Sequence, residues 1–214
     1  MMFVRSVAGE RKLRKNILKE SRDCSLKQGC GDIQGSEQNN DGEFLRIAGI
    51  MKESIVDGPG IRFAIFCQGC PHDCEGCHNP STHSFQDGEI IKISNILKYI
   101  DENPLIQGVT FSGGEPLCQV KPFLNLAKEV KNRNLHLLIY TGYTIEELEK
   151  RMRKEPELEE LLRTADHLIE GRFVQKLRNL SLLYRGSSNQ RIIDLNDYFS
   201  TGEIIPCENI TFNS

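Results

Sequence analysis

From Phe44 onward, short apolar runs alternate with segments in which apolar residues recur every three or four positions. Short apolar or alternating runs predict strands. The predicted strands cover residues 44–51, 61–66, 109–111, 135–140, 167–169 and 190–193. Between them, spacings of three and four predict helices, as for Ile93, Ile96, Leu97 and Ile100. Further helices are predicted near residues 120–127, 145–152 and 158–165, and Thr144 with Glu147 forms the sequence pattern of a capping box.

This alternation of strands and helices predicts right-handed β-α-β crossovers and a parallel sheet. A closed eight-stranded barrel needs about 250 residues, and residues 44–214 are too few for one. We therefore expect an α/β fold, an open and incomplete (β/α) barrel. Ligands of such sheets bind at the carboxyl ends of the strands, so the segments that follow the strands are the candidates for function.

Residues 1–43 have a different composition. They begin basic, turn polar and contain few large apolar residues, so they cannot bury enough surface to order themselves. We expect a flexible, disordered extension over 1–43 and a single domain over 44–214.

Composition and charge narrow the class of protein. With 38% hydrophobic residues the chain has an ordinary globular composition, and a net charge of −3 argues against a nucleic-acid-binding surface. No apolar run approaches the ~18 residues of a membrane span, and no secretory signal is visible at the start. We expect a cytoplasmic protein without a membrane partner.

The main candidate for chemistry is the stretch 66–80, FCQGCPHDCEGCHNP, in which Cys70, Cys74 and Cys77 have the spacing C-x3-C-x2-C. Three thiolates this close predict a metal site. A four-iron, four-sulfur cluster takes one ligand per iron, so three cysteines leave one iron open to a small chelating molecule such as the methionine end of S-adenosylmethionine. Cys67 ends an apolar run, and we expect it to pack as a small hydrophobic residue.

Zinc remains an alternative for this loop, with His72 or His78 as a fourth ligand. Zinc knuckles usually draw their ligands from two pairs separated by a longer loop, and no second pair follows here. The spacing favours an iron–sulfur cluster, while a zinc site or a cluster of redox thiols stays open.

Beyond the cysteines, a predicted strand runs into Gly113-Gly114-Glu115-Pro116, and the two motifs together resemble the radical S-adenosylmethionine superfamily. Residues 57–62 (DGPGIR) and 76–79 (GCHN) are similar to the glycyl-radical-enzyme activases. Residues 141–143 (TGY), 170–174 (EGRFV) and 184–190 (YRGSSNQ) resemble one branch, the activating proteins of anaerobic ribonucleoside-triphosphate reductase. The resemblance covers about residues 44–195.

The resemblance implies that Cys70, Cys74 and Cys77 hold a 4Fe-4S cluster whose open iron is chelated by S-adenosylmethionine. One electron, from a donor such as flavodoxin or ferredoxin, would cleave the cofactor. The resulting 5′-deoxyadenosyl radical would take a hydrogen atom from a backbone glycine of the reductase. The cofactors carry this chemistry, and the protein supplies orientation.

Gly113, Gly114 and Glu115 have two interpretations. Glycines let the backbone approach a ligand closely, and their carbonyls with the Glu115 carboxylate are acceptors suited to the methionine ammonium. The alternative is a tight turn with a capping carboxylate. Behind a three-cysteine loop we favour the ligand role.

Glu170 and Arg172 are the candidates for the ribose or the methionine carboxylate, although an ordinary surface ion pair fits them equally. Many superfamily members have an aromatic residue before the third cysteine, where this chain has Gly76. We therefore expect any adenine contact at Gly76 to be made through the backbone, and we count Cys77 and His78 beside it among the cofactor-binding residues. Residues 185–190 are either a contact for the partner's glycine loop or a hydrogen-bonded turn.

Two alternative functions remain. An activase of pyruvate formate-lyase would fit residues 57–60 and 76–79, although the short chain and residues 185–190 favour the reductase branch. A zinc-stabilised binding module without catalysis belongs to a different class, and the two classes differ in bound iron and acid-labile sulfide.

Overall fold

The computed structural model describes residues 42–208 and 210, and its centre is a set of four parallel strands. These strands are β2 (Arg62–Cys67), β4 (Gly108–Gly113), β5 (His136–Tyr140) and β6 (His167–Glu170). Their pairings are parallel throughout. Since parallel strands end at the same edge of a sheet, the segments after Cys67, Gly113, Tyr140 and Glu170 all leave from one edge.

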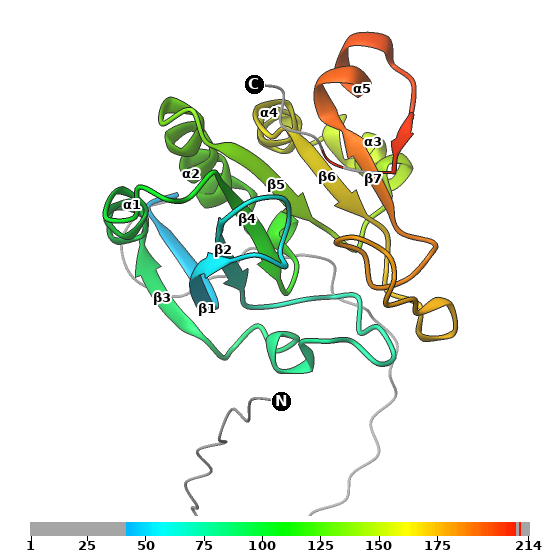
Figure 1. Cartoon of the computed structure of the whole chain (residues 1–214), viewed down its shortest axis with the longest axis horizontal. Coiled ribbons are helices and arrows are strands. Elements are labelled where there is room, and N and C mark those ends of the chain that lie inside the picture. The colour runs from blue at the N-terminus through cyan, green and yellow to red at the C-terminus, as the bar shows by residue number, and fades with distance from the viewer. Residues whose placement is uncertain (1–41, 209, 211–214) are drawn as a thin grey trace, which may run out of the picture.

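Two antiparallel pairs of strands flank this centre. They are β1 (Phe44–Ser54) with β3 (Glu89–Lys92), and β7 (Arg191–Asp194) with β8 (Pro206–Cys207). The sheet order is β3-β1-β2-β4-β5-β6-β7-β8, with β3 and β8 at open edges in the part of the chain described (Figure 1). The expected open, incomplete barrel is confirmed, but the expectation of a wholly parallel sheet is wrong. No α-helix connects β1 to β2 or β6 to β7, so neither pair has the crossover that parallel strands need.

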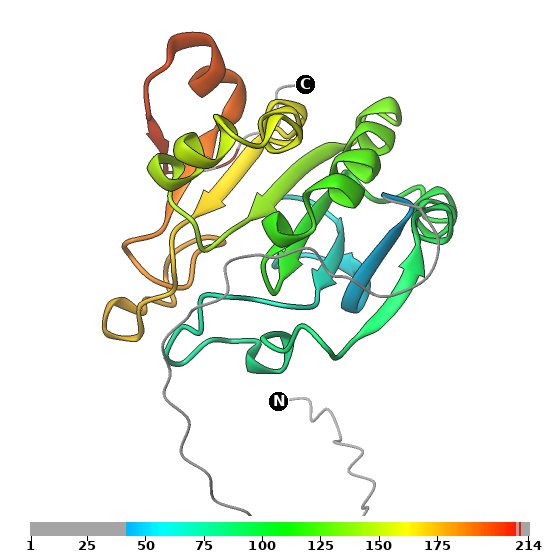
Figure 2. The same cartoon turned by 180° about the vertical axis from the view of Figure 1, so that it is seen from behind.

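The helices cover one face of the sheet, the face toward the viewer in Figure 2. They are α1 (Ile93–Asp101), α2 (Val120–Asn132), α3 (Ile145–Met152), α4 (Pro156–Thr164) and α5 (Leu195–Thr201). The predicted capping box is present, because the Thr144 hydroxyl accepts from the Glu147 amide and the Glu147 carboxylate from the Thr144 amide. Phe63, Phe111 and Phe123 are fully buried between sheet and helices.

On the other face, the loop 55–61 folds against the sheet and Arg62 is buried beneath it. Arg62 donates from Nε to Thr110 Oγ1 at 2.6 Å and from Nη2 to the Val109 carbonyl at 2.6 Å. It also donates to the Pro59 carbonyl at 3.3 Å. Burial lowers the pKa of this guanidinium to about 10. Part of the DGPGIR stretch therefore has a structural role. The Pro59 carbonyl accepts a hydrogen bond from the buried Arg62 guanidinium, a charge that is costly to bury without partners.

The start of the described chain already belongs to the fold. The Gly42 carbonyl accepts from Asn125 Nδ2 at 2.9 Å, and the Glu43 carbonyl accepts from the Ile93 amide at 2.9 Å. The disordered extension expected over 1–43 otherwise lies outside the described residues. Within the described part, no helix has the length and apolar character needed to cross a bilayer.

Candidate active site

The cysteine loop, defined here as residues 68–88, leaves the sheet after β2 and returns to it at β3. Its stem is closed by backbone hydrogen bonds, from the Gly69 amide to the Thr82 carbonyl (2.8 Å) and from the Cys70 amide to the His83 carbonyl (3.2 Å). Gly69 has φ +94°, and the Phe85 ring occupies the space a side chain would need. The loop is therefore fixed at its base by the protein itself.

Cys70, Cys74 and Cys77 are half-buried free thiols in this loop. Burial raises the pKa of Cys70 to about 12 and also raises that of Cys74. Thiols of this kind become thiolates when a metal takes the proton's place. The Asn79 amide donates to Cys77 Sγ at 3.4 Å, a contact of the sort that tunes cluster thiolates. The donor set thus fits an iron–sulfur cluster held through three cysteines.

Two further observations bear on the ligand assignment. Cys67 is fully buried at the end of β2, and burial raises the pKa of its thiol well above the usual value, as expected for a packed side chain. Among residues 42–208 and 210, no three Cys, His, Asp or Glu side chains converge closely enough to hold a single metal ion. The ligand assignment therefore stands on the spacing, exposure and chemistry of the three thiols.

The turn after β4 lies directly against the cysteine loop. The Gly114 amide donates to the Cys67 carbonyl at 2.9 Å, and the Glu115 amide donates to the Gly69 carbonyl at 2.8 Å. A Cβ on Gly114 would lie 2.4 Å from that Gly69 oxygen, and Gly113 has φ +92° with the Cys67 backbone nitrogen 2.6 Å from its would-be Cβ. Both glycines are thus explained by close backbone contact, that of Gly113 with the end of β2 and that of Gly114 with the cysteine loop, independently of any ligand.

The Glu115 carboxylate is fully buried and connects three segments of the site. Oε1 accepts from the Leu117 amide at 3.0 Å and from Thr141 Oγ1 at 2.9 Å. Oε2 accepts from the Gly142 amide at 2.9 Å and contacts His72 Nε2 at 2.7 Å. Two lone pairs on each oxygen are then engaged. The carboxylate positions the cysteine loop over the ends of β4 and β5, and a methionine ammonium would have to displace one of these partners to reach it.

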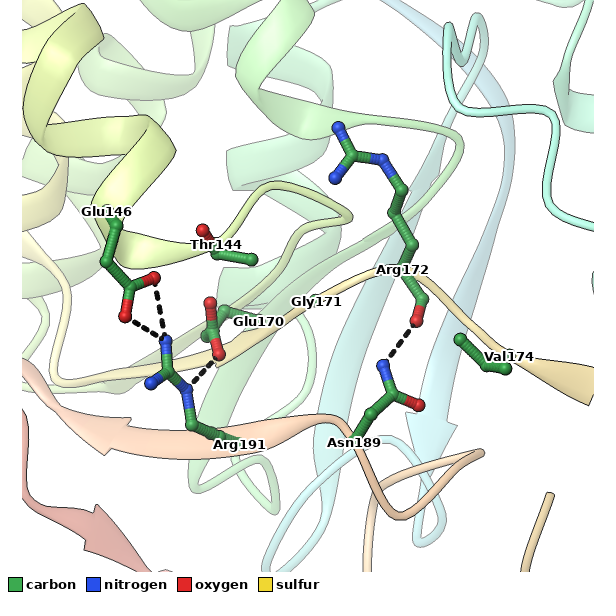
Figure 3. Close-up of a pocket in the computed structure, with 8 residues that line it drawn as sticks. All are labelled: Thr144, Glu146, Glu170, Gly171, Arg172, Val174, Asn189 and Arg191. Atoms are coloured by element: carbon green, nitrogen blue, oxygen red, sulfur yellow. Dashed lines mark hydrogen bonds and ion pairs between the residues drawn. The ribbon is translucent and has the colours of Figure 1, made fainter. Parts of the chain in front are cut away.

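Glu170 and Arg172 do not act together. Glu170 is buried, and its carboxylate accepts from the Ile145 amide at 2.8 Å and from Arg191 Nε at 2.5 Å. Arg191 also donates to Glu146 at 2.9 Å. Figure 3 shows the Arg172 guanidinium extending away from the Glu170–Arg191 pair. Sequence reasoning missed Arg191, since no spacing links it to Glu170.

Arg172 is the exposed member of this region, with 43% of its side chain accessible, and it pairs with Glu147 at 3.1 Å. An exposed pair of this kind contributes little to stability, so the guanidinium is available to a competing carboxylate. The pocket beside it measures about 430 Å³ and is lined by Thr144, Glu146, Glu170, Gly171, Arg172, Val174, Asn189 and Arg191. Arg172 is thus the residue of this pair whose position suits ligand binding.

Residues 185–190 form a hydrogen-bonded turn, one of the two interpretations expected. Gln190 Oε1 accepts from the Gly186 amide at 2.8 Å, and its Nε2 donates to the Gly171 carbonyl at 2.9 Å. Asn189 Nδ2 donates to the Arg172 carbonyl at 2.8 Å. This turn fixes the segment after β6 beside the cysteine loop, where the His78 ring lies 5.2 Å from that of Phe173.

Comparison with known proteins supports this assembly of motifs. A family model described as a 4Fe-4S single cluster domain matches residues 56–193. The anaerobic ribonucleoside-triphosphate reductase-activating protein of Haemophilus influenzae is 36% identical over 148 residues, 64% of this chain and 90% of that protein. The proteins of the same name from Escherichia coli and Enterobacteria phage T4 are 35% and 33% identical, over 90% and 86% of their lengths and 64% of this chain.

This chain belongs to the family of anaerobic ribonucleoside-triphosphate reductase-activating proteins. It is therefore an enzyme with an iron–sulfur cluster domain, and the predicted branch of reductase-activating proteins is confirmed. A solved structure, QueE from Escherichia coli, superposes with a TM-score of 0.39 at 18% identity over 47% of this chain and 53% of that one.

Gly76 and His78, two of the predicted cofactor-binding residues, also belong to the cysteine loop. Both are exposed. Gly76 has φ +72°, and a Cβ there would meet the Gln175 side chain at 2.4 Å. A backbone role at Gly76 fits this geometry, and the adenine contact itself stays a prediction.

Proposed function

We propose that this chain reductively cleaves S-adenosylmethionine at a 4Fe-4S cluster held by Cys70, Cys74 and Cys77, and thereby generates a glycyl radical on an anaerobic ribonucleoside-triphosphate reductase. The observation that carries the proposal is the three free thiols of one loop, in a chain 36% identical to a protein named for activating that reductase. When bound, cluster and cofactor would supply a 5′-deoxyadenosyl radical after one-electron reduction by a flavodoxin or ferredoxin.

The residues of the chain would bind and orient the cofactor. Arg172 is exposed beside the pocket. Its guanidinium is suited to a bidentate contact with the methionine carboxylate, which would replace its present ion pair with Glu147. The backbone carbonyls of Gly113 and Gly114 are candidates for the ammonium. Glu115 would hold the cysteine loop in register with that turn, through its contacts with His72 and Thr141.

The open sheet also supports a protein substrate. The cysteine loop and the segment after β6 lie at the same edge, with no further strand closing the described sheet between β3 and β8. A backbone glycine on another chain can approach only if this edge stays accessible to a polypeptide loop. An incomplete barrel meets that requirement, where a closed one would cover it.

The test is anaerobic reconstitution followed by electron paramagnetic resonance. The reduced, cluster-loaded protein with S-adenosylmethionine should produce a glycyl radical doublet on the anaerobic reductase of the same organism, and no signal on pyruvate formate-lyase. A doublet on the lyase alone would move the chain to the other activase branch. Absence of iron and sulfide after reconstitution, with zinc bound instead, would favour the non-catalytic binding module.

A further inference from the structure

We propose that residues 172–185, here called the docking loop, form the surface on which the activated protein binds, and that its partner segment presents apolar side chains beside carboxylates. This proposal rests on the proposed function and names where the protein substrate is held. The docking loop follows β6 and returns to β7 without an α-helix.

The docking loop exposes four large apolar side chains. The accessible fractions are 37% for Val174, 44% for Leu177, 82% for Leu180 and 53% for Leu183. Each square ångström of apolar surface left in water forgoes about 25 cal/mol of burial free energy. Several large apolar residues in one short exposed loop, rimmed by polar ones, are typical of a protein-binding surface.

The charge of the docking loop is of one sign. It contains Arg172, Lys176, Arg178 and Arg185 and no Asp or Glu, in a chain whose net charge is −3. Lys176 and Arg178 are exposed, and neither pairs with a carboxylate among the residues the structure describes. Two unpaired cations flanking exposed leucines favour an acidic and apolar partner segment.

The docking loop has a defined shape before any partner binds. The Val174 amide donates to Ser187 Oγ at 3.2 Å, the Ser188 amide to the Leu177 carbonyl at 2.9 Å, and the Asn179 amide to the Gly186 carbonyl at 3.2 Å. Ser187 is fully buried. A preformed surface loses less conformational entropy when it binds, so the RGSSNQ turn acts as the support of the docking loop.

The docking loop also adjoins the candidate active site. Phe173 contacts the His78 ring at 5.2 Å, and Gln175 lies over Gly76. Figures 1 and 2 show the two loops side by side at the same edge of the sheet in both views. A polypeptide seated on Leu180 and Leu183 would therefore continue across the cysteine loop, where its glycine has to be placed.

The test uses the full-length, cluster-loaded protein and the anaerobic reductase of the same organism. The variants are Leu180→Ser with Leu183→Ser, and Lys176→Glu with Arg178→Glu. Matched controls are Ile90→Ser with Leu105→Ser, which are 62% and 61% exposed, and Arg153→Glu with Lys154→Glu. We expect both test pairs to weaken the reductase complex by about tenfold or more, and the controls to bind like wild type.

Radical yield, measured with dithionite as reductant, should fall in parallel, while 5′-deoxyadenosine release without the reductase stays at the wild-type level. Unchanged affinity in both test pairs, or an equal loss of affinity in the controls, would show that the docking loop is not the surface that binds the reductase. So would a defect seen only with a flavodoxin donor, or an oligomeric state of the leucine variant that differs from that of the wild type. Wild-type protein that binds the reductase but forms no glycyl radical would overturn the proposed function and leave the docking surface standing.

Discussion

His72 in the cysteine loop and Glu115 in the turn after β4 lie 43 residues apart in the chain and share a 2.7 Å contact between Nε2 and Oε2. Both side chains are almost fully buried. The contact joins the loop that carries the three thiols to the ends of the parallel strands. The position of the thiols over the sheet therefore depends on a carboxylate that is itself not a candidate ligand of the metal.

Replacing Glu115 with Ala should destabilise the fold as well as weaken cofactor binding. The substitution leaves the buried Leu117 amide and the partly buried Gly142 amide without an acceptor, and an unsatisfied buried donor costs about 1–3 kcal/mol. Urea unfolding of the cluster-free protein should show the loss as a lower midpoint. Glu75→Ala, at an exposed position in the same loop, is the matched control, and equal midpoints for the two variants would contradict a positioning role.

Replacing Cys70, Cys74 or Cys77 with Ala should abolish cluster assembly. Cys67→Ala and Cys207→Ala should retain it, since Cys67 is packed in the core and Cys207 lies on β8 away from the loop. Iron and acid-labile sulfide per chain are the readout after anaerobic reconstitution. A Cys67→Ala protein that is folded but takes up no iron would show that the ligand set includes the wrong cysteines.

Arg172→Ala should weaken S-adenosylmethionine binding while cluster content stays constant. Loss of a hydrogen bond to a charged group costs about 1.5–3 kcal/mol, and the pairing with Glu147 is too exposed for its removal to unfold the protein. Calorimetric titration of the cluster-loaded variant gives the affinity. Arg153→Ala is the control for loss of a surface charge, and wild-type affinity in Arg172→Ala would exclude Arg172 from the cofactor site.

Stability should fall with acidification through the pair His136 and His167, whose Nε2 and Nδ1 lie 3.0 Å apart. Burial lowers the pKa of His136 to about 4 and lowers that of His167. The unfolded chain takes up protons near the ordinary pKa of about 6.5, so the folded state loses stability as the pH falls from about 6.5 toward 4. Above that range the contribution is constant.

Urea midpoints of the cluster-free protein at a series of pH values measure this slope. His136→Gln should flatten it, while His83→Gln, at a site apart from this pair, should leave it unchanged. A wild-type slope that persists in His136→Gln would assign the acid sensitivity to other groups.

A chain that begins at Asp41 should fold and keep its activity. It retains the Gly42 carbonyl that accepts from Asn125 and the Glu43 carbonyl that accepts from Ile93. Thermal unfolding and radical yield compare it with the full chain. Reduced activity at equal stability would assign a function to residues 1–40.

The sequence predicted much of this fold because its central elements are long and periodic. The buried faces of α1 and α2 repeat every three to four residues, and the apolar strands β2 and β5 are contiguous runs. β3 and β8 were missed because four residues and two residues are too short to show a period. The direction of β7 depends on the absence of a crossover helix, which local pattern does not encode.

The candidate site was predictable to the same extent. Three cysteines at short spacing and the cap of Glu115 on the Leu117 amide are local information, whereas the other donors to Glu115, from His72, Thr141 and Gly142, come from segments that only the folded sheet brings together. The same holds for Arg191, which neutralises Glu170 from the neighbouring antiparallel strand. Sequence reasoning favoured a ligand role for Glu115 and left Glu170 open between a ligand role and an ion pair. The folded chain gives both carboxylates protein partners, and Glu170 is paired with Arg191.

The closed stem of the cysteine loop bears on how an iron–sulfur cluster would be inserted. In zinc fingers the metal and the fold depend on each other, but here Gly69, Cys70 and Phe85 fix the loop with bonds and packing that need no metal. We therefore expect the stem to keep its shape before a cluster is inserted. Loss of iron by oxidation should accordingly leave this stem folded, so that a cluster could be rebuilt on the existing chain.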